Sequence, residues 1–488
     1  MIAHLALLFA AAAAPVPCES LGNIDLPGVT ITAAELRPAG PPPAGAPGQA
    51  PASLPAHCRV AAVLAPSPDS HIEMELWLPA DDWNGKFQAV GNGGWAGTIS
   101  TPAMASALRE GYATASTDTG HRGGNALFGI GHPEKVVDYA YRAVHEMTVR
   151  SKALITAHYG RPPALSYWNG CSTGGRQALM SAQRYPEDFD GIVAGAPANA
   201  HSRLHASDMA LTVELLRHPA GKIPASKLPM LHRAVLAACD ALDGVRDGLL
   251  EDPRKCRFDP AVLQCRGEEG DACLTEAQVE TVRKMYAPVR TPGGGTVFPG
   301  KAPGSESAWY MAGAEAPSPI SVGTFQLTYQ DGDWDWRTFD AGRDTRLAEE
   351  RTGFINAVDP DLGRFKARGG KLLLYHGWND TGIAPGNTIE YYESVVSALG
   401  PDQGDWLRLF MVPGMGHCSG GDGPDQAGFM AALERWREGG ESPERITAYR
   451  VTGNRVEMSR PLCPYPRTAH YKGIGSVNDA ENFECRLP

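Results

Sequence analysis

The chain has 488 residues, and its 44 lysine and arginine residues against 55 aspartate and glutamate residues give a net charge of −11. Hydrophobic residues make up 43% and charged residues 20%, which is ordinary for a globular protein and excludes wholesale disorder. An acidic chain without a long lysine or arginine run is not expected to bind nucleic acid. No apolar run reaches the roughly 18 residues of a membrane-spanning helix. We therefore expect a globular protein that binds neither nucleic acid nor membrane; its oligomeric state is not indicated.

The first 17 residues are typical of a signal peptide. Residues 5–14 form an apolar stretch, and its last alanines suit cleavage by signal peptidase. The alternative is a first helix of the mature protein. Ten cysteines, with no CxxC pair among them, favour full disulfide pairing in an oxidising compartment over a zinc ribbon or a redox motif. We therefore predict export to the periplasm or the medium.

Short apolar segments predict a mostly parallel sheet. Residues 71–78 (HIEMELWL) alternate apolar and polar side chains, as a half-buried strand does. The expected strands are 71–78, 87–90, 112–116, 165–168, 192–194, 371–376 and 406–412, and the expected helices are 134–158 and 387–399. Strands that alternate with helices are typical of βαβ units and of an α/β fold.

The alternation of strands and helices stops in the middle of the chain. Residues 200–369 contain segments rich in Asp, Cys and Trp and show no βαβ pattern, which resumes from residue 370. We therefore predict a single α/β domain in two parts, 18–199 and 370–488, with 200–369 inserted between them.

A nucleophile is predicted at Ser172. It lies in the GxSxG pattern of residues 170–174, after the apolar strand LSYW and before the helix-compatible stretch RQALMSAQRY. Glycines on both sides of the serine allow the sharp turn that exposes its Oγ atom. The backbone N–H of Thr173, directly after the serine, can donate to an oxyanion. The alternative is a small-residue turn that packs a helix on a sheet.

A serine nucleophile needs a base and an orienting carboxylate, which follow it in the order acid then histidine in α/β-hydrolases. Asp380 closes the segment KLLLYHGWND, and His417 lies in the loop after the strand LRLFMV. His376 competes as the base, but it falls inside its strand, where a packed residue is expected. Asp118 competes as the acid, but it precedes the serine. Ser172, Asp380 and His417 are therefore the predicted triad.

The second oxyanion donor is expected from the glycine-rich segment 91–97 (GNGGWAG), which directly follows the strand FQAV. Backbone without a Cβ atom can approach a substrate carbonyl closely, so Gly93 or Gly94 is the predicted donor. The alternative is an ordinary glycine turn. A phosphate cradle is disfavoured, because no GKS or GKT sequence follows.

Two cysteines neighbour the predicted catalytic residues. Cys171 directly precedes Ser172, and Cys418 directly follows His417. If the serine and the histidine are within hydrogen-bond reach, their neighbours can approach the Cα separation of ~5.5–6 Å that a disulfide needs. We therefore predict a Cys171–Cys418 bridge that clamps the two catalytic loops together.

The motifs GCSTGGR, GWND and PGMGHC stand in this order, with both adjacent cysteines, and together they resemble the tannase and feruloyl esterase family. That family includes the hydrolase of mono(2-hydroxyethyl) terephthalate. The resemblance spans Cys18 to Cys485. It implies an α/β-hydrolase core with a large inserted lid, here 200–369. It also implies the disulfides Cys18–Cys58, Cys239–Cys256, Cys265–Cys273 and Cys463–Cys485.

An acidic loop in the lid predicts a structural calcium ion. Residues 239–249 (CDALDGVRDGL) place three aspartates close together beside two glycines, and Ca²⁺ prefers carboxylate and carbonyl oxygens. The spacing differs from an EF-hand, and the alternative is a solvated acidic turn. The resemblance to the family's calcium loop implies as ligands the side chains of Asp240, Asp243 and Asp247 and the carbonyls of Val245 and Leu249.

The resemblance implies a secreted serine carboxylesterase that acts on small esters of aromatic acids. Hydroxycinnamate esters rank first, gallates second and a terephthalate monoester third, because no lid arginine stands out as the cation that a free carboxylate needs. Trp334 and Trp336 are candidates to stack on the acyl ring, or else belong to the lid core. The alternative from another class is an inactive binding protein with a hydrolase fold.

Overall fold

The structure is a computed structural model that describes residues 15–41, 53–291 and 293–487. Most of the predicted signal segment, residues 1–14, lies outside the described residues.

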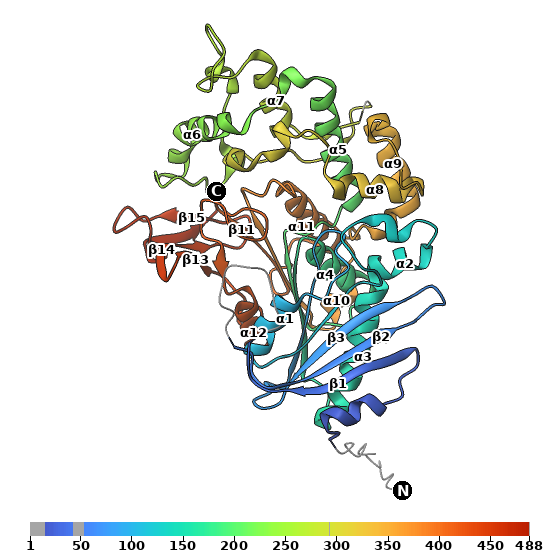
Figure 1. Cartoon of the computed structure of the whole chain (residues 1–488). Helices are drawn as coiled ribbons and strands as arrows, with labels where there is room; N and C mark the ends of the chain where they lie inside the picture. Colours follow the sequence, from blue (N-terminus) through green and yellow to red (C-terminus); the bar gives the residue numbers. More distant parts are fainter. Residues whose placement is uncertain (1–14, 42–52, 292, 488) are drawn as a thin grey trace.

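A nine-stranded sheet forms the centre of the molecule (Figure 1). In spatial order its strands are β1 (Val29–Arg37), β2 (His57–Leu64), β3 (Ile72–Pro79), β5 (Ala113–Thr117), β4 (Lys86–Val90), β6 (Leu165–Cys171), β7 (Gly191–Gly195), β10 (Lys371–Gly377) and β11 (Leu407–Val412). Neighbouring strands from β1 to β5 are antiparallel, and those from β5 to β11 are parallel. All seven predicted strands are present in this sheet. β1 and β2 were not predicted.

Helices cover both faces of the sheet. They are α1 (Thr101–Arg109), α2 (Pro133–Val137), α3 (Ala143–Tyr159), α4 (Thr173–Arg184), α11 (Gly386–Leu399) and α12 (Phe429–Gly439). Strand β10 shows why two layers form, since side chains alternate along a strand. Leu372 and Leu374 join the cluster that contains residues of α3, α4 and α11, whereas Leu373 and Tyr375 join the cluster of α12.

The predicted helix 134–158 is interrupted in the structure. A π-helical turn, Asp138–Arg142, separates α2 from α3. Such a turn adds one residue to the helical repeat and is often found at functional sites. Here it buries both Asp138 and Tyr139.

Between β7 and β10 the chain forms a largely helical unit, shown in green to orange above the sheet in Figure 1. Its elements are α5 (His201–Arg217), α6 (Leu228–Cys239), α7 (Glu276–Tyr286), the hairpin β8 (Val289–Arg290) and β9 (Thr296–Phe298), α8 (Pro319–Tyr329) and α9 (Ala341–Thr352). At the end of this stretch α10 (Gly363–Ala367) lies beside α4, where Phe365 joins the core cluster. Two apolar clusters lie largely within it, one around Trp309 and one around Phe325. We call residues 200–369 the lid.

The C-terminal region adds small antiparallel sheets beside the core. They are β12 (Gln426–Ala427) with β13 (Ile446–Thr452) and β14 (Arg455–Leu462), and the hairpin of β15 (Thr468–Tyr471) and β16 (Phe483–Arg486). Among the described helices, none has both the length and the apolar character needed to cross a bilayer.

Candidate active site

Ser172 lies at the sharp turn between β6 and α4. Its backbone has φ 64° and ψ −120°, a conformation that is strained for a residue with a Cβ atom. The flanking glycines make the turn possible. A Cβ atom on Gly170 would lie 2.7 Å from the carbonyl oxygen of Gly174, which is closer than side chains approach. The turn has the geometry of a nucleophile elbow.

The three predicted triad residues meet in the structure. His417 Nε2 lies 2.9 Å from Ser172 Oγ, and His417 Nδ1 lies 2.7 Å from Asp380 Oδ2. Asp380 follows β10 and His417 follows β11, so the carboxyl ends of two neighbouring parallel strands bring them together. The spacing allows the serine hydroxyl to donate to the imidazole and the imidazole N–H to donate to the carboxylate.

Asp380 is fully buried and surrounded by donors. Its Oδ1 atom accepts hydrogen bonds from the backbone N–H groups of Gly382 and Ile383, each at 2.8 Å. Burial alone opposes ionisation of this carboxyl, but hydrogen bonds from His376 and His417 outweigh it and hold its pKa below the usual value. Burial likewise opposes protonation of His417, but the contact with Asp380 raises its pKa above the ordinary 6.5.

Neither competing residue occupies a triad position. His376 is fully buried within β10, with its Nδ1 atom 2.7 Å from Thr388 Oγ1 and its Nε2 atom 3.0 Å from Asp380 Oδ2. It therefore contacts the acid rather than the nucleophile. Asp118 lies after β5, where its Oδ1 atom accepts hydrogen bonds from the backbone N–H groups of Glu73 and Gly120. Burial raises the pKa of Asp118 to about 7.

The predicted Cys171–Cys418 disulfide is present, with a Cα separation of 6.0 Å. It links the residue before the elbow serine to the residue after the histidine. The four pairings implied by the family resemblance are also present: Cys18–Cys58, Cys239–Cys256, Cys265–Cys273 and Cys463–Cys485. All ten cysteines are therefore paired.

The glycine-rich segment after β4 packs directly on the elbow. Gly93 and Gly94 line the same cavity as Ser172 and Thr173. A Cβ atom on Gly91 would lie 2.5 Å from the Cα atom of Gly174, so the close approach of segment and helix requires glycine.

Asn92 fixes this segment, a role that sequence reasoning did not assign. Its Nδ2 group donates to the carbonyls of Thr98 and Thr117, and its backbone N–H donates to Gln177 Oε1 at 3.1 Å. Gln177 in turn donates from Nε2 to Asn92 Oδ1 at 3.0 Å. In the sequence, the only indication of this role is that Asn92 interrupts the glycines of the GNGG segment.

Arg176 was not predicted either. Its guanidinium is fully buried and donates to the backbone carbonyls of Tyr139, Ala140 and Ile355. Burial lowers its pKa. Tyr139 then donates its hydroxyl to the carbonyl of Gly94, as does the Thr173 hydroxyl, each at 2.9 Å. The π-helical turn thus supports the glycine segment through Arg176 and Tyr139.

A cavity of about 480 Å³ opens beside the triad, between the elbow and the lid. Lid residues from α5 and α8, among them His201, His205, Asp208 and Ser321, line it together with Ser172 and His417. Neither Trp334 nor Trp336 is among the lining residues. Trp334 instead packs against Phe325 and stacks on Tyr329, which places it in the lid core.

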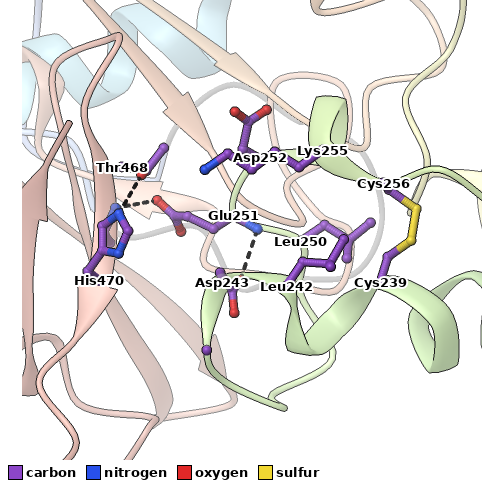
Figure 2. A pocket seen from close by; sticks show the side chains of 12 residues that line it. Cys239, Leu242, Asp243, Leu250, Glu251, Asp252, Lys255, Cys256, Thr468 and His470 are labelled. Atoms are coloured by element: carbon purple, nitrogen blue, oxygen red, sulfur yellow. Dashed lines mark hydrogen bonds between the residues drawn. A yellow bond between two sulfur atoms is a disulfide. The ribbon is translucent and has the colours of Figure 1, made fainter. Parts of the chain in front are cut away.

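The acidic loop lies against a second cavity, of about 260 Å³. Figure 2 shows Glu251 between Asp243 and the C-terminal hairpin, with the Cys239–Cys256 disulfide on the lid side. The aspartates bind backbone N–H groups of their own loop, and Asp247 also pairs with Arg460. Within residues 15–41, 53–291 and 293–487, no three His, Cys, Asp or Glu side chains converge into a group that could hold a metal ion.

The sheet order, the elbow and the triad geometry define an α/β-hydrolase. The family model for tannase and feruloyl esterase matches residues 58–486. The chain therefore belongs to the tannase and feruloyl esterase family, and it is a carboxylic ester hydrolase.

Similar proteins support this assignment over the whole chain. An uncharacterised esterase of Xanthomonas campestris is 38% identical, over 99% of this chain and 93% of the relative. The mono(2-hydroxyethyl) terephthalate hydrolase of Piscinibacter sakaiensis is 32% identical, over 96% of this chain and 92% of the relative. The crystal structure of feruloyl esterase B from Aspergillus oryzae matches with a TM-score of 0.90 and 32% identity, covering 96% of this chain and 99% of that one.

Proposed function

We propose that this esterase is a secreted serine carboxylesterase that hydrolyses esters of aromatic acids, with hydroxycinnamate esters such as feruloyl esters as its substrates. The observation that carries the proposal is the continuous contact from Ser172 Oγ through His417 to Asp380, at 2.9 and 2.7 Å, at the mouth of a cavity between core and lid. The family membership supports the substrate class.

In the proposed mechanism His417 Nε2 takes the proton of Ser172 as Oγ attacks the ester carbonyl carbon. Asp380 keeps the proton on His417 Nδ1 and stabilises the imidazolium that forms. The backbone N–H of Thr173, at the start of α4, and that of Gly93 or Gly94 donate to the oxyanion. His417 then returns the proton to the leaving alcohol, and water attacks the acyl-enzyme with the same histidine as base.

The Cys171–Cys418 bridge supports this mechanism by linking the two loops that carry nucleophile and base. The five disulfides suit an oxidising compartment, which supports export together with the apolar N-terminal segment.

We also propose a structural calcium ion at the acidic lid loop, held by the side chains of Asp240, Asp243 and Asp247 and the carbonyls of Val245 and Leu249. In the structure the three side chains accept from backbone N–H groups of their loop and do not converge, so the proposal requires them to turn toward the ion. The donor chemistry suits Ca²⁺. Burial, with the neighbouring charges of the other two aspartates, raises the pKa of Asp243 to about 6. A bound cation would relieve this excess of negative charge. Glu251, directly after this loop, accepts a hydrogen bond from the Ala469 N–H in the β15–β16 hairpin. An ion bound in the loop would therefore also stabilise the contact between the lid and the C-terminal region.

The substrate assignment is tested by kcat/KM on methyl ferulate, methyl gallate, mono(2-hydroxyethyl) terephthalate and p-nitrophenyl butyrate. We expect methyl ferulate to be preferred. If the aliphatic ester is preferred by about tenfold, or roughly 1.4 kcal/mol of transition-state stabilisation, the aromatic assignment is wrong while the serine esterase stands. If methyl gallate or the terephthalate monoester is preferred, the hydroxycinnamate assignment is replaced by that substrate.

A further inference from the structure

A cavity of about 690 Å³ lies between α1, α12 and the sheet (Figure 1). Helix α1 packs on β3, β4 and β5, and α12 packs on β7 and β10, so the two helices flank the middle of this sheet face. We call this space the α1–α12 cavity. Of the residues that line it, only Cys418 also lines the active-site cavity. Its volume is in the range of small-molecule sites, about 300–1,000 Å³.

Three polar side chains of the sheet line the α1–α12 cavity without a hydrogen-bond partner. They are Gln88 on β4, Asn169 on β6 and Tyr375 on β10. Gln88 is only 5% exposed and Tyr375 9%. Within the part of the chain that the structure describes, none of the three side chains forms a hydrogen bond, yet their polar atoms stay accessible. Buried polar groups almost always have partners, so the contents of the cavity must supply them here.

The alternation of side chains along the strands turns both amides toward the cavity. Phe87 of β4 and Trp168 of β6 join the core cluster on the opposite face, which contains residues of α3 and α4. Gln88 and Asn169 follow them directly and therefore point to the face of α1 and α12. In the parallel ladder Gln88 pairs with Tyr167, so the two amides lie on neighbouring strands, close along the same face.

The charged groups of the cavity wall are paired within the protein. Among the described lining residues Lys86 is the only cation, and its Nζ atom lies 2.7 Å from a carboxylate oxygen of Glu434 and 2.7 Å from one of Glu438. Asp425 accepts a hydrogen bond from a backbone N–H at 2.7 Å. Glu110, the remaining charged residue, is exposed. The wall therefore offers no free cation to an anionic ligand, and its unpartnered groups are neutral.

These groups select a neutral ligand rich in hydroxyls. Amide and phenol groups both donate and accept hydrogen bonds, and so do the hydroxyls of a sugar. Burial raises the pKa of Tyr375 to about 12, so its hydroxyl keeps its proton. The ring of Tyr375 stacks on that of Phe429, with 4.1 Å between centroids, and both rings line the cavity as an apolar surface for the C–H groups of a sugar. An apolar ligand would instead leave the polar groups desolvated and unpaired, which is costly.

We propose that the α1–α12 cavity is a second ligand site, separate from the active site, which binds a neutral sugar through Gln88, Asn169 and Tyr375. This inference goes beyond the proposed function and does not depend on it. A ligand held there occupies neither the triad nor the lid side of the active-site cavity.

Isothermal titration of the native protein with three neutral trisaccharides, xylotriose, cellotriose and mannotriose, tests the proposal. Trigalacturonate is the anionic counterpart. We expect at least one neutral trisaccharide to bind with a Kd in the millimolar range or tighter, and trigalacturonate to bind more weakly. Gln88→Leu and Tyr375→Phe should each weaken this binding by about fivefold or more, because each removes a hydrogen bond to the ligand. Neither variant should lose stability, since neither side chain bonds within the described protein.

Gln183→Leu is the matched control. Gln183 is a partly buried amide of α4, on the other face of the sheet, where it donates to Tyr391. It should keep the native affinity. If Gln88→Leu fails to fold, Tyr375→Phe decides, because it removes a single oxygen atom.

Three results would overturn the sugar site. The first is that no neutral trisaccharide binds, or that trigalacturonate binds more tightly. The second is that the Gln88 and Tyr375 variants bind as the native protein does, or lose stability while Gln183→Leu does not. The third is competitive inhibition of p-nitrophenyl acetate hydrolysis by the bound trisaccharide, which would place the sugar in the active site. Hydrolysis that is unaffected by saturating trisaccharide would support a separate site.

Discussion

His376 and His417 approach the same carboxylate oxygen, Asp380 Oδ2, at 3.0 and 2.7 Å. His376 Nδ1 lies 2.7 Å from the Thr388 hydroxyl, which can donate to it and so leave the proton of His376 on Nε2, facing Asp380. His376 therefore helps to keep Asp380 ionised and in position, and it leaves the contact between Asp380 and His417 intact for the proposed mechanism.

The first prediction concerns the pH dependence of activity. Because Asp380 raises the pKa of His417 above 6.5, the imidazole stays protonated to a higher pH than a free histidine. The neutral form is the base, so kcat/KM on a neutral ester should rise with pH to a plateau, with a midpoint above 6.5.

Asp380→Asn should lower kcat by about 10⁴-fold, because the asparagine no longer holds the required tautomer. It should also move the midpoint of the remaining activity to lower pH, since the charge that favours imidazolium is gone. A midpoint that stays in place in this variant would show that another group sets the pH profile.

The second prediction concerns the disulfide between the catalytic loops. Replacing Cys171 and Cys418 together with alanine should cost about 2–5 kcal/mol in the free energy of unfolding. It should also lower kcat, because the serine and histidine loops gain freedom relative to each other.

Replacing Cys265 and Cys273, which form a bridge within the lid, is the control for this experiment. It should reduce stability with a smaller effect on kcat. Equal losses of kcat in the two double variants would argue against a specific role for the Cys171–Cys418 bridge.

The third prediction concerns the glycine segment. Gly91→Ala should destabilise the protein by about 1–3 kcal/mol or more, because its Cβ atom would overlap the Cα atom of Gly174. Gly93→Ala is the matched control for stability, since an added Cβ there meets no atom within 4 Å. Denaturant unfolding measures both. Equal stability of the two variants would contradict the close contact between segment and elbow.

The fourth prediction concerns calcium. Removal of the ion by a chelator should lower the thermal unfolding temperature without abolishing turnover at once, because an ion that binds only the folded state stabilises by mass action. Asp243→Asn and Asp247→Asn should each lose the response to chelator, whereas Asp271→Asn, at an exposed lid position, should keep it. An unchanged unfolding curve after chelation, with no calcium found by elemental analysis, would identify the loop as a solvated acidic turn.

The positions of the triad were predictable because each residue lies at or just beyond the carboxyl end of a core strand. Parallel strands deliver the residues at their carboxyl ends to one edge of the sheet, so Ser172, Asp380 and His417 meet whatever the lid does. The Cys171–Cys418 bridge followed from that meeting, since the two cysteines directly neighbour Ser172 and His417.

Two sets of residues could not be predicted from the sequence: those that hold the active-site segments in place, and those of the lid that lie near the cavity. Arg176 acts through backbone carbonyls of segments far away in the sequence, which no local pattern reveals. Asp208 and Lys301 are separated by a long stretch of the lid, and their proximity depends on how the lid packs. Trp334 stood out in the sequence, but the packing of α8 places it in the lid core.

The central claim is that Ser172 is the nucleophile, and covalent labelling tests it most directly. The native protein is treated with a fluorophosphonate, which reacts with activated serines, and its peptides are analysed by mass spectrometry. We predict one adduct per chain, on the peptide that contains Ser172, formed in step with the loss of esterase activity. Complete loss of activity with Ser172 unmodified, or full activity with Ser172 labelled, would contradict the account.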